Sequence, residues 1–148
     1  MNDEELLKYY YEELIMSLIT MSLPAEEQKD IIGIGCLGDE MLNDFDDFYR
    51  MRRQTYIDNK VFDGRQLKIL DEFNEFLDKF NGQNEDFYWD IEELKNNPLW
   101  AALREEAKKV VTNVFGKNYK IEIQRENKLE NGRVVLEHTK RKLIEVCD

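Results

Sequence analysis

The sequence predicts a mainly α fold: a bundle of four to five helices followed by a C-terminal β-hairpin or extended tail, with an α+β fold as the alternative. Two helices with clear start and stop signals lie between residues 63 and 116, and apolar residues recur with helical spacing before them. A strand-like alternation follows Gly116. We expect residues 1–116 to form an acidic helical domain and residues 117–148 to form a hairpin or tail packed on the same domain.

The first of the two central helices is expected to run from Asp63 to Gly82. Asp63 and Gly64 provide a start signal, and the pair Asn81-Gly82 tolerates the left-handed backbone found at helix ends. Apolar residues in this segment recur every three or four positions, which predicts one broad buried face. That face consists of Ile69, Leu70, Phe73, Phe76, Leu77 and Phe80.

The second central helix is expected to begin at Pro98 and to end at Gly116. Asn97 is a good cap, and proline fits the first helical position because its missing N–H would have no helical partner there. Small residues allow a close helix neighbour, so we expect the two central helices to form a helical hairpin. The small residues are Ala101, Ala102 and Ala107, and the expected buried face is Leu99, Leu103, Ala107, Val110 and Val114.

Three further helical segments are predicted nearer the N-terminus: residues 3–21, Pro24 to Ile32, and Asp39 to about Tyr56. Three consecutive tyrosines, Tyr9 to Tyr11, cannot all point inward, so at least one is expected to face water or a partner. The expected inward residues are Leu7, Tyr10, Leu14, Ile15, Leu18, Ile19 and Met21 in the first segment, and Met41, Leu42, Phe45, Phe48 and Tyr49 in the third.

The run Gly33-Ile34-Gly35-Cys36-Leu37-Gly38 has the spacing of a dinucleotide-binding fingerprint. That fingerprint requires a strand before it and a parallel βαβ unit around it. Here the preceding residues, Ala25 to Lys29, are helix formers. We therefore interpret these glycines as a tight connection between packed helices.

The C-terminal segment has a different pattern from the rest of the chain. Tyr119, Ile121 and Ile123 alternate with charged residues, and Asn131-Gly132 is a hairpin-type turn sequence. We expect a β-hairpin, in which residues 139–146 form either a strand or a last short helix.

Charge excludes several classes of partner. The chain of 148 residues carries 32 acidic and 21 basic residues, a net charge of −11. Residues 117–148 carry +2, which leaves −13 for residues 1–116. Such a body repels nucleic acids and anionic membranes, so neither is an expected partner. The acidic N-terminus does not resemble a signal peptide, and Cys36 and Cys147 lack metal-site or disulfide-framework spacing, so a cytoplasmic location is expected.

Two acidic segments are the candidate partner-binding residues. Glu40, Asp44 and Asp47 are spaced to form a ridge on one helix side, opposite the apolar face, although a merely solvated face is the alternative. Phe87, Tyr88 and Trp89 cannot share one face, so one aromatic is expected to emerge among carboxylates, or all three plug the end of the helical hairpin. The candidates from this second segment are Glu85, Asp86, Trp89 and Asp90.

Arg52 falls within the apolar stripe between Tyr49 and Tyr56. It is expected either to stack on aromatic rings and pair with an acid, to line a groove, or to extend its charge to solvent at a helix end.

Catalytic motifs are scarce. The sole histidine is His138, no GxSxG sequence occurs, and we expect no catalytic triad, metal ligand or cofactor. One alternative uses carboxylates alone: Glu72-x-x-Glu75 and Asp90-x-x-Glu93 resemble the ExxE and ExxD pairs of all-α nucleotide pyrophosphatases, with Asp and Glu exchanged in the second pair. That resemblance implies a Mg²⁺-dependent enzyme.

The function expected from these observations is binding without catalysis. A compact acidic domain can neutralise a basic protein, as immunity proteins do for toxins, because long-range attraction speeds association. The oligomeric state does not follow from the sequence pattern.

Overall fold

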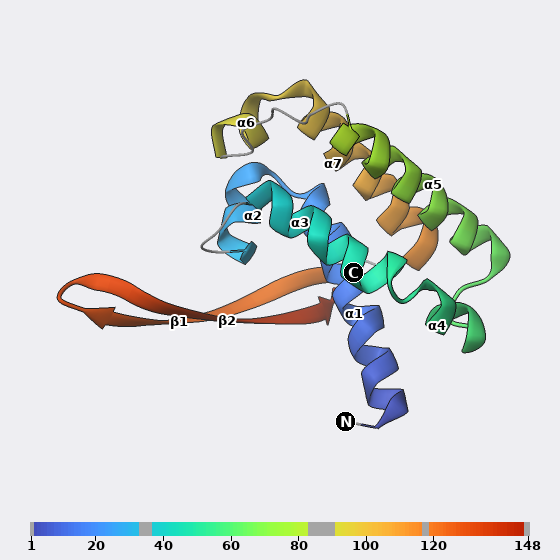
Figure 1. Cartoon of the computed structure of the whole chain (residues 1–148), viewed down its shortest axis with the longest axis horizontal. Coiled ribbons are helices and arrows are strands. Elements are labelled where there is room, and N and C mark those ends of the chain that lie inside the picture. Colours follow the sequence, from blue (N-terminus) through green and yellow to red (C-terminus); the bar gives the residue numbers. More distant parts are fainter. Residues whose placement is uncertain (1, 33–36, 83–90, 117–118, 147–148) are drawn as a thin grey trace.

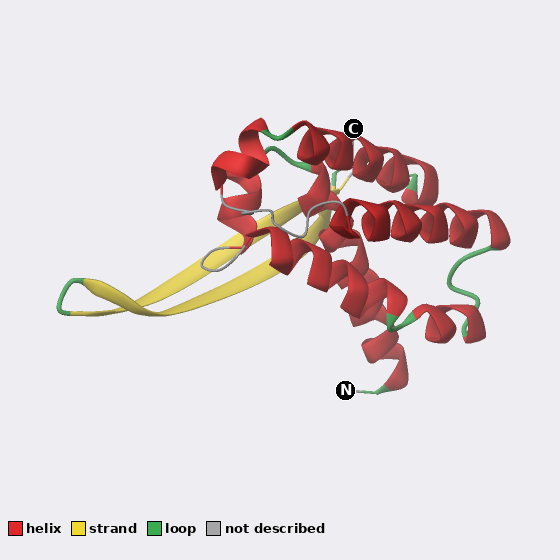
Figure 2. Ribbon diagram, turned by 45° about the horizontal axis from the view of Figure 1, so that its top comes forward, coloured by secondary structure: helices red, strands yellow, loops and turns green. Residues whose placement is uncertain are grey.

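A computed structural model describes residues 2–32, 37–82, 91–116 and 119–146. It confirms a mainly helical fold with a C-terminal hairpin, and Figures 1 and 2 show the hairpin projecting from the helical body. The helices are α1 (Asp3–Ser22), α2 (Ala25–Ile32), α3 (Leu37–Phe45), α4 (Arg53–Asp58), α5 (Gly64–Gly82), α6 (Ile91–Asn96) and α7 (Pro98–Val110). Two π-helical turns, η1 (Asp46–Arg50) and η2 (Val111–Phe115), and two strands, β1 (Tyr119–Glu130) and β2 (Arg133–Glu145), complete the described elements.

Helix α1 lies at the centre of the molecule. The Asn2 side chain accepts a hydrogen bond from the Glu5 N–H, and the Glu5 carboxylate accepts one from the Asn2 N–H, so a capping box begins the helix. All residues from Leu14 to Met21 are buried, because this half of α1 is surrounded by α2, α3 and α7. The helix predicted over residues 3–21 is confirmed.

The boundaries of the two central helices are also confirmed. Asp63 and Gln66 form a reciprocal capping box at the start of α5, with distances of 2.8 and 2.9 Å. The Asn97 side chain accepts a hydrogen bond from the Leu99 N–H at 2.8 Å, and Pro98 opens α7. Gly116 ends the helical segment with φ 63°, in the left-handed region that glycine tolerates. Helices α5 and α7 pack against each other as the predicted helical hairpin.

The predicted close neighbour at Ala101 and Ala102 is wrong, because both residues are exposed. Helix α7 instead buries the face that carries Trp100, which has no exposed surface, and packs most extensively on α1. The reason is geometric: Ala101 and Ala102 lie about 100° and 200° around the helix from Trp100, since each residue advances by about 100°. The buried residues of this segment are Trp100, Leu103, Ala107, Val110 and Val114, while Leu99 is half-buried.

The prediction of a single helix from Asp39 to Tyr56 is also wrong. The structure has α3, the π turn η1, a break at Met51 and Arg52, and then α4. The break carries Met51 to the surface, where it is 67% exposed, while Tyr49 and Tyr56 on either side are buried. The Tyr56 hydroxyl donates a hydrogen bond to the Phe48 carbonyl across this bend. Burial of both rings therefore outweighs helix continuity.

Arg52 confirms the stacking part of its first alternative, whereas the predicted pairing with an acid is made by its neighbour. The guanidinium carbon of Arg52 lies 4.2 Å from the centroid of the Tyr10 ring. The neighbouring Arg53 makes the acid pair: its Nε and Nη2 donate hydrogen bonds of 2.9 and 2.8 Å to the two oxygens of Asp71 on α5. Tyr49 also donates to Asp71. Hydrogen bonds from Arg53 lower the pKa of Asp71, so this carboxylate stays ionised and ties α4 and η1 to α5.

Strands β1 and β2 pair antiparallel, so the predicted hairpin is confirmed and residues 139–145 continue as strand. Asn131 and Gly132 have φ values of 52° and 76°, as a tight two-residue turn requires. The inner end of β1 packs on α1 (Figure 1). Residues 33–36 of the glycine-rich run lie outside the described residues, but α2 precedes them and Leu37 begins α3. The predicted connection therefore joins two helices, and its own conformation lies outside the described residues.

Candidate partner-binding surface

The predicted acidic ridge lies on α3 and η1. Glu40 and Asp47 are exposed, but Asp44 is half-buried under the hairpin, so the merely solvated face, which was the alternative, does not describe the middle residue. The reason is a long-range contact, since Arg141 of β2 reaches Asp44. No spacing within residues 39–56 contains this information.

Arg141 lies between two carboxylates from different helices. Its Nη2 is 3.6 Å from Glu13 Oε2 on α1, and its Nη1 is 3.7 Å from Asp44 Oδ2 on α3. The side chains of Arg141, Glu13 and Asp44 are 27%, 14% and 25% exposed. Burial raises the pKa of Glu13 and of Asp44 above their ordinary values, and Arg141 opposes this rise without cancelling it. One cation thus faces two carboxylates, and its attraction does not outweigh the cost of their burial.

Tyr9 adds an aromatic ring beside these charges. It is 44% exposed and makes an edge contact with Phe48, at 5.9 Å between ring centroids. The pKa of the Tyr9 hydroxyl is raised, mainly by burial and next by the charge of Glu13. The hydroxyl therefore stays protonated and can donate a hydrogen bond. The prediction that one of the three tyrosines faces outward is confirmed. Tyr11, by contrast, packs against Phe62 and Phe115.

We define the acidic aromatic surface as Tyr9 and Glu13 of α1, Glu40 and Asp44 of α3, and Asp47 of η1. Beside it lies a cavity of about 140 Å³ lined by Ile31, Ile32, Glu40, Asp44 and Arg141. Its lining combines apolar side chains from the end of α2 with carboxylates from α3. Because its two carboxylates outnumber the one cation, Arg141, this lining suits the apolar stem and charged head of a lysine or arginine side chain.

The other predicted binding residues, Glu85, Asp86, Trp89 and Asp90, lie outside the described residues. Sequence reasoning had missed Glu13 and Arg141, and it did not place Tyr9 beside the ridge. The helical spacing of Tyr9 and Glu13, four residues apart, was a usable signal that they share a face. The position of Arg141 carried no comparable signal.

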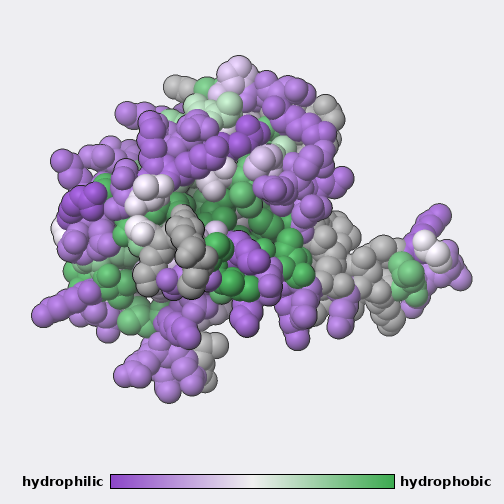
Figure 3. Space-filling view, turned by 180° about the vertical axis from the view of Figure 1, so that it is seen from behind, coloured by the Kyte–Doolittle hydropathy of each residue, from purple (hydrophilic) through white to green (hydrophobic). Residues whose placement is uncertain are grey.

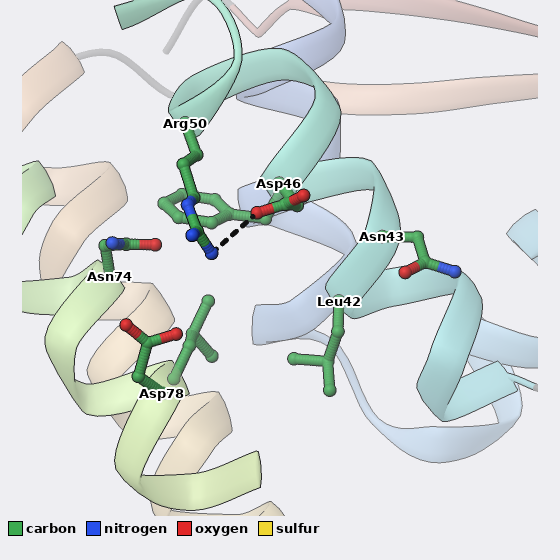
Figure 4. Close-up of a pocket in the computed structure, with 8 residues that line it drawn as sticks. Leu42, Asn43, Asp46, Arg50, Asn74 and Asp78 are labelled. Atoms are coloured by element: carbon green, nitrogen blue, oxygen red, sulfur yellow. Dashed lines mark hydrogen bonds and ion pairs between the residues drawn. The ribbon is translucent and has the colours of Figure 1, made fainter. Parts of the chain in front are cut away.

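A second pocket, of about 230 Å³, lies between α3, η1 and α5. Figure 4 shows Asp46 and Arg50 on one side, joined by an ion pair of 3.4 Å, and Asn74 and Asp78 across from them. Arg50 and Asp46 have side chains that are 61% and 46% exposed, so this pair is a weak, solvated one. The pocket is lined by these polar side chains and also by the core residues Phe45 and Leu77.

The structure describes the side chains of only two of the four carboxylates of the enzyme alternative. Glu72 and Glu75 are exposed on α5, in a shallow groove that also contains Arg53 and Lys68. Asp90 is outside the described residues, and the side chain of Glu93 is not among those described. Among the described residues, no three His, Cys, Asp or Glu side chains are grouped to hold a metal ion.

We expect millimolar Mg²⁺ to leave the melting temperature unchanged relative to the same ionic strength of NaCl. The physical reason is that Glu72 and Glu75 are solvated and lie beside two cations, Arg53 and Lys68. Thermal unfolding followed by circular dichroism measures this. A stoichiometric Mg²⁺ site detected by calorimetry and abolished by Glu72→Gln would contradict the expectation and support the pyrophosphatase alternative.

Seen from behind, hydrophilic side chains cover most of the periphery of the body, while hydrophobic ones show in the middle of this face (Figure 3). None of the described helices combines the length and the apolar character needed to cross a bilayer.

No family model, curated protein or solved structure matches the chain.

Proposed function

We propose that this chain is a non-enzymatic binding protein that neutralises a basic protein, such as a toxin, by holding it on the acidic aromatic surface. One observation carries this proposal: the surface already binds a guanidinium, that of Arg141, between Glu13 and Asp44. Glu40 and Asp47 remain exposed next to this internal pair. The surface thus has the chemistry to bind further cations.

Charge counting supports the same conclusion. The four carboxylates of the surface and the single Arg141 leave a local charge of −3, within a body whose 116 residues carry −13. Exposed charges act mainly on the rate of association and are screened beyond about 8 Å at physiological salt. Tyr9 is expected to slow dissociation, which the exposed charges affect less. A half-exposed aromatic side chain of this kind commonly contributes much of the binding energy at an interface.

The test is capture of a partner by the wild-type chain, followed by binding kinetics on matched variants. Glu40→Lys combined with Asp47→Lys should slow association, with a loss that shrinks as salt is raised. Asp44 is unsuitable for this purpose because its replacement would also release Arg141. The matched control is Glu72→Lys combined with Glu75→Lys, the same charge change on the exposed side of α5.

Tyr9→Ala is expected to increase the dissociation rate by about fivefold or more, since removal of an interface aromatic commonly costs more than 1 kcal/mol. Surface plasmon resonance at two salt concentrations separates this effect from the association effect of the charge variants. An acidic captured protein, or binding that is equally sensitive to the α5 control, would contradict the proposed surface.

A further inference from the structure

The outer half of the hairpin projects into solvent as a two-stranded ribbon (Figures 1 and 2). Its inner half is attached through the contact of β1 with α1 and through Arg141. An isolated two-stranded ribbon is marginally stable in water, and each outer edge presents unpaired backbone N–H and C=O groups. A further strand along one edge would therefore stabilise this part of the molecule.

The edge of β1 is more regular than that of β2. Lys128 pairs with Leu136 and Leu129 pairs with Val134, so Val135 is an extra residue that forms a bulge in β2. Bulges disrupt the ladder and protect an edge from further pairing. Strand β1 runs for 12 residues with no such insertion.

Among the described residues, β1 forms backbone hydrogen bonds only with β2, so its other edge is open to a partner strand. Ile121 and Ile123 are half-buried, whereas Lys120 and Glu122 between them are exposed. This alternation shows that α1 covers one face of the strand, because successive side chains point to opposite faces. Because α1 contacts a face of β1, the hydrogen-bonding edge of β1 can still pair with another strand.

We propose that β1 pairs antiparallel with β1 of a second copy of this chain, about a twofold axis at Arg125, so that two hairpins form one four-stranded sheet. Two opposite-charge pairs and one apolar pair then face each other on each side of the axis, and such cross-strand pairs stabilise a sheet. The pairs are Lys120 with Glu130, Ile121 with Leu129, Glu122 with Lys128, Ile123 with Asn127 and Gln124 with Glu126.

The charge pattern selects this register over its neighbours. A shift of two residues one way sets Lys120 opposite Lys128, and a shift the other way sets Glu122 opposite Glu130. Like charges directly opposite each other destabilise a sheet. In the selected register only one pairing joins like charges, that of Arg125 with Arg125 of the second copy on the twofold axis.

Leu129 provides a second, independent reason for a partner strand. It is 61% exposed and lies two residues before the Asn131-Gly132 turn. In the proposed dimer Leu129 lies beside Ile121 of the second copy, at the inner end of that copy's hairpin. An exposed apolar residue is thereby covered by one that is already half-buried.

The experiment is sedimentation equilibrium of the full chain over a wide concentration range. We expect a reversible monomer–dimer equilibrium. Lys120→Glu and Glu130→Lys should each raise the dimer Kd about tenfold, because each creates two like-charge pairs per dimer. The double variant exchanges the two charges and should return the Kd to within about threefold of the wild-type value. Leu129→Asp should weaken the dimer as well.

Lys140→Glu is the matched control, since it makes the same charge change at an exposed position of β2 and should leave the Kd unchanged. Far-UV circular dichroism checks that each variant is folded. A chain that stays monomeric throughout, or a dimer that is indifferent to the two single charge reversals, would overturn the proposal. A double variant whose dimer Kd is higher than that of both single variants would also overturn it.

Discussion

Phe73→Ala is expected to reduce the free energy of unfolding by about 3–5 kcal/mol, the range for removing a buried aromatic ring. Phe73 is 3% exposed on α5. Its ring makes an edge contact with Phe45, at 5.2 Å between centroids, and stacks on Phe76 at 6.3 Å. Truncation would therefore leave a cavity where α3 and α5 meet, and well-packed neighbours would collapse into it only in part. Chemical denaturation measures this loss.

Leu77→Ala, one turn along the same face, is expected to cost about 2–5 kcal/mol, toward the lower end. Leu77 borders the 230 Å³ pocket, so water can enter part of the space that its side chain leaves. Glu72→Ala is the control, since it removes an exposed side chain next to Phe73 and should be nearly neutral. A Phe73→Ala variant as stable as Glu72→Ala would show that this face of α5 is not the core.

Arg141→Met is expected to destabilise the fold by about 2 kcal/mol at neutral pH, because it leaves two largely buried carboxylates without their cation. Breaking a fully buried pair costs about 3–5 kcal/mol, and partial exposure with separations of 3.6 and 3.7 Å reduces that figure. Met keeps a long apolar side chain against the body. The variant should also increase hydrogen exchange in β2, since Arg141 attaches the hairpin to α1 and α3.

The pH dependence of this variant has a definite sign. Glu13 and Asp44 have pKa values raised in the folded state, so the folded state takes up their protons before the unfolded state does. Stability therefore rises as pH falls from neutral through these raised values, until the unfolded carboxyls titrate near about pH 4. Loss of Arg141 removes the charge that opposed the rise. The deficit of Arg141→Met should consequently shrink between pH 7 and about pH 4.

Neutral replacements of both acids provide the control. Adding Glu13→Gln and Asp44→Asn to Arg141→Met should recover much of the lost stability and abolish its pH dependence, since no buried charge remains unpaired. Asp71 contributes in the opposite direction, because its lowered pKa makes its stabilisation disappear as pH falls through the folded value. A deficit that stays constant on acidification would mean that Arg141 acts by packing and not by charge.

The sequence by itself determined the elements with strong local signals. Asn97 and Pro98 mark the start of α7, Gly116 marks the end of the helical segment that follows it, and Asn131-Gly132 marks the hairpin turn; all three appear where they were predicted. Each signal depends on the conformational preference of one or two residues, which is the same in any fold. The apolar face of α5 was predictable for a similar reason, since helical spacing alone puts its residues on one side.

Tertiary structure decided what depends on residues far apart in the chain. The break at Met51 and Arg52 follows from the burial of Tyr49 and Tyr56 by other helices, which outweighs the intrinsic preference of that segment for one helix. The raised pKa of Asp44 follows first from its burial, which Arg141, 97 positions away in sequence, opposes. Local periodicity places a carboxylate on a face, but only packing determines which cation reaches it and how much water remains around it.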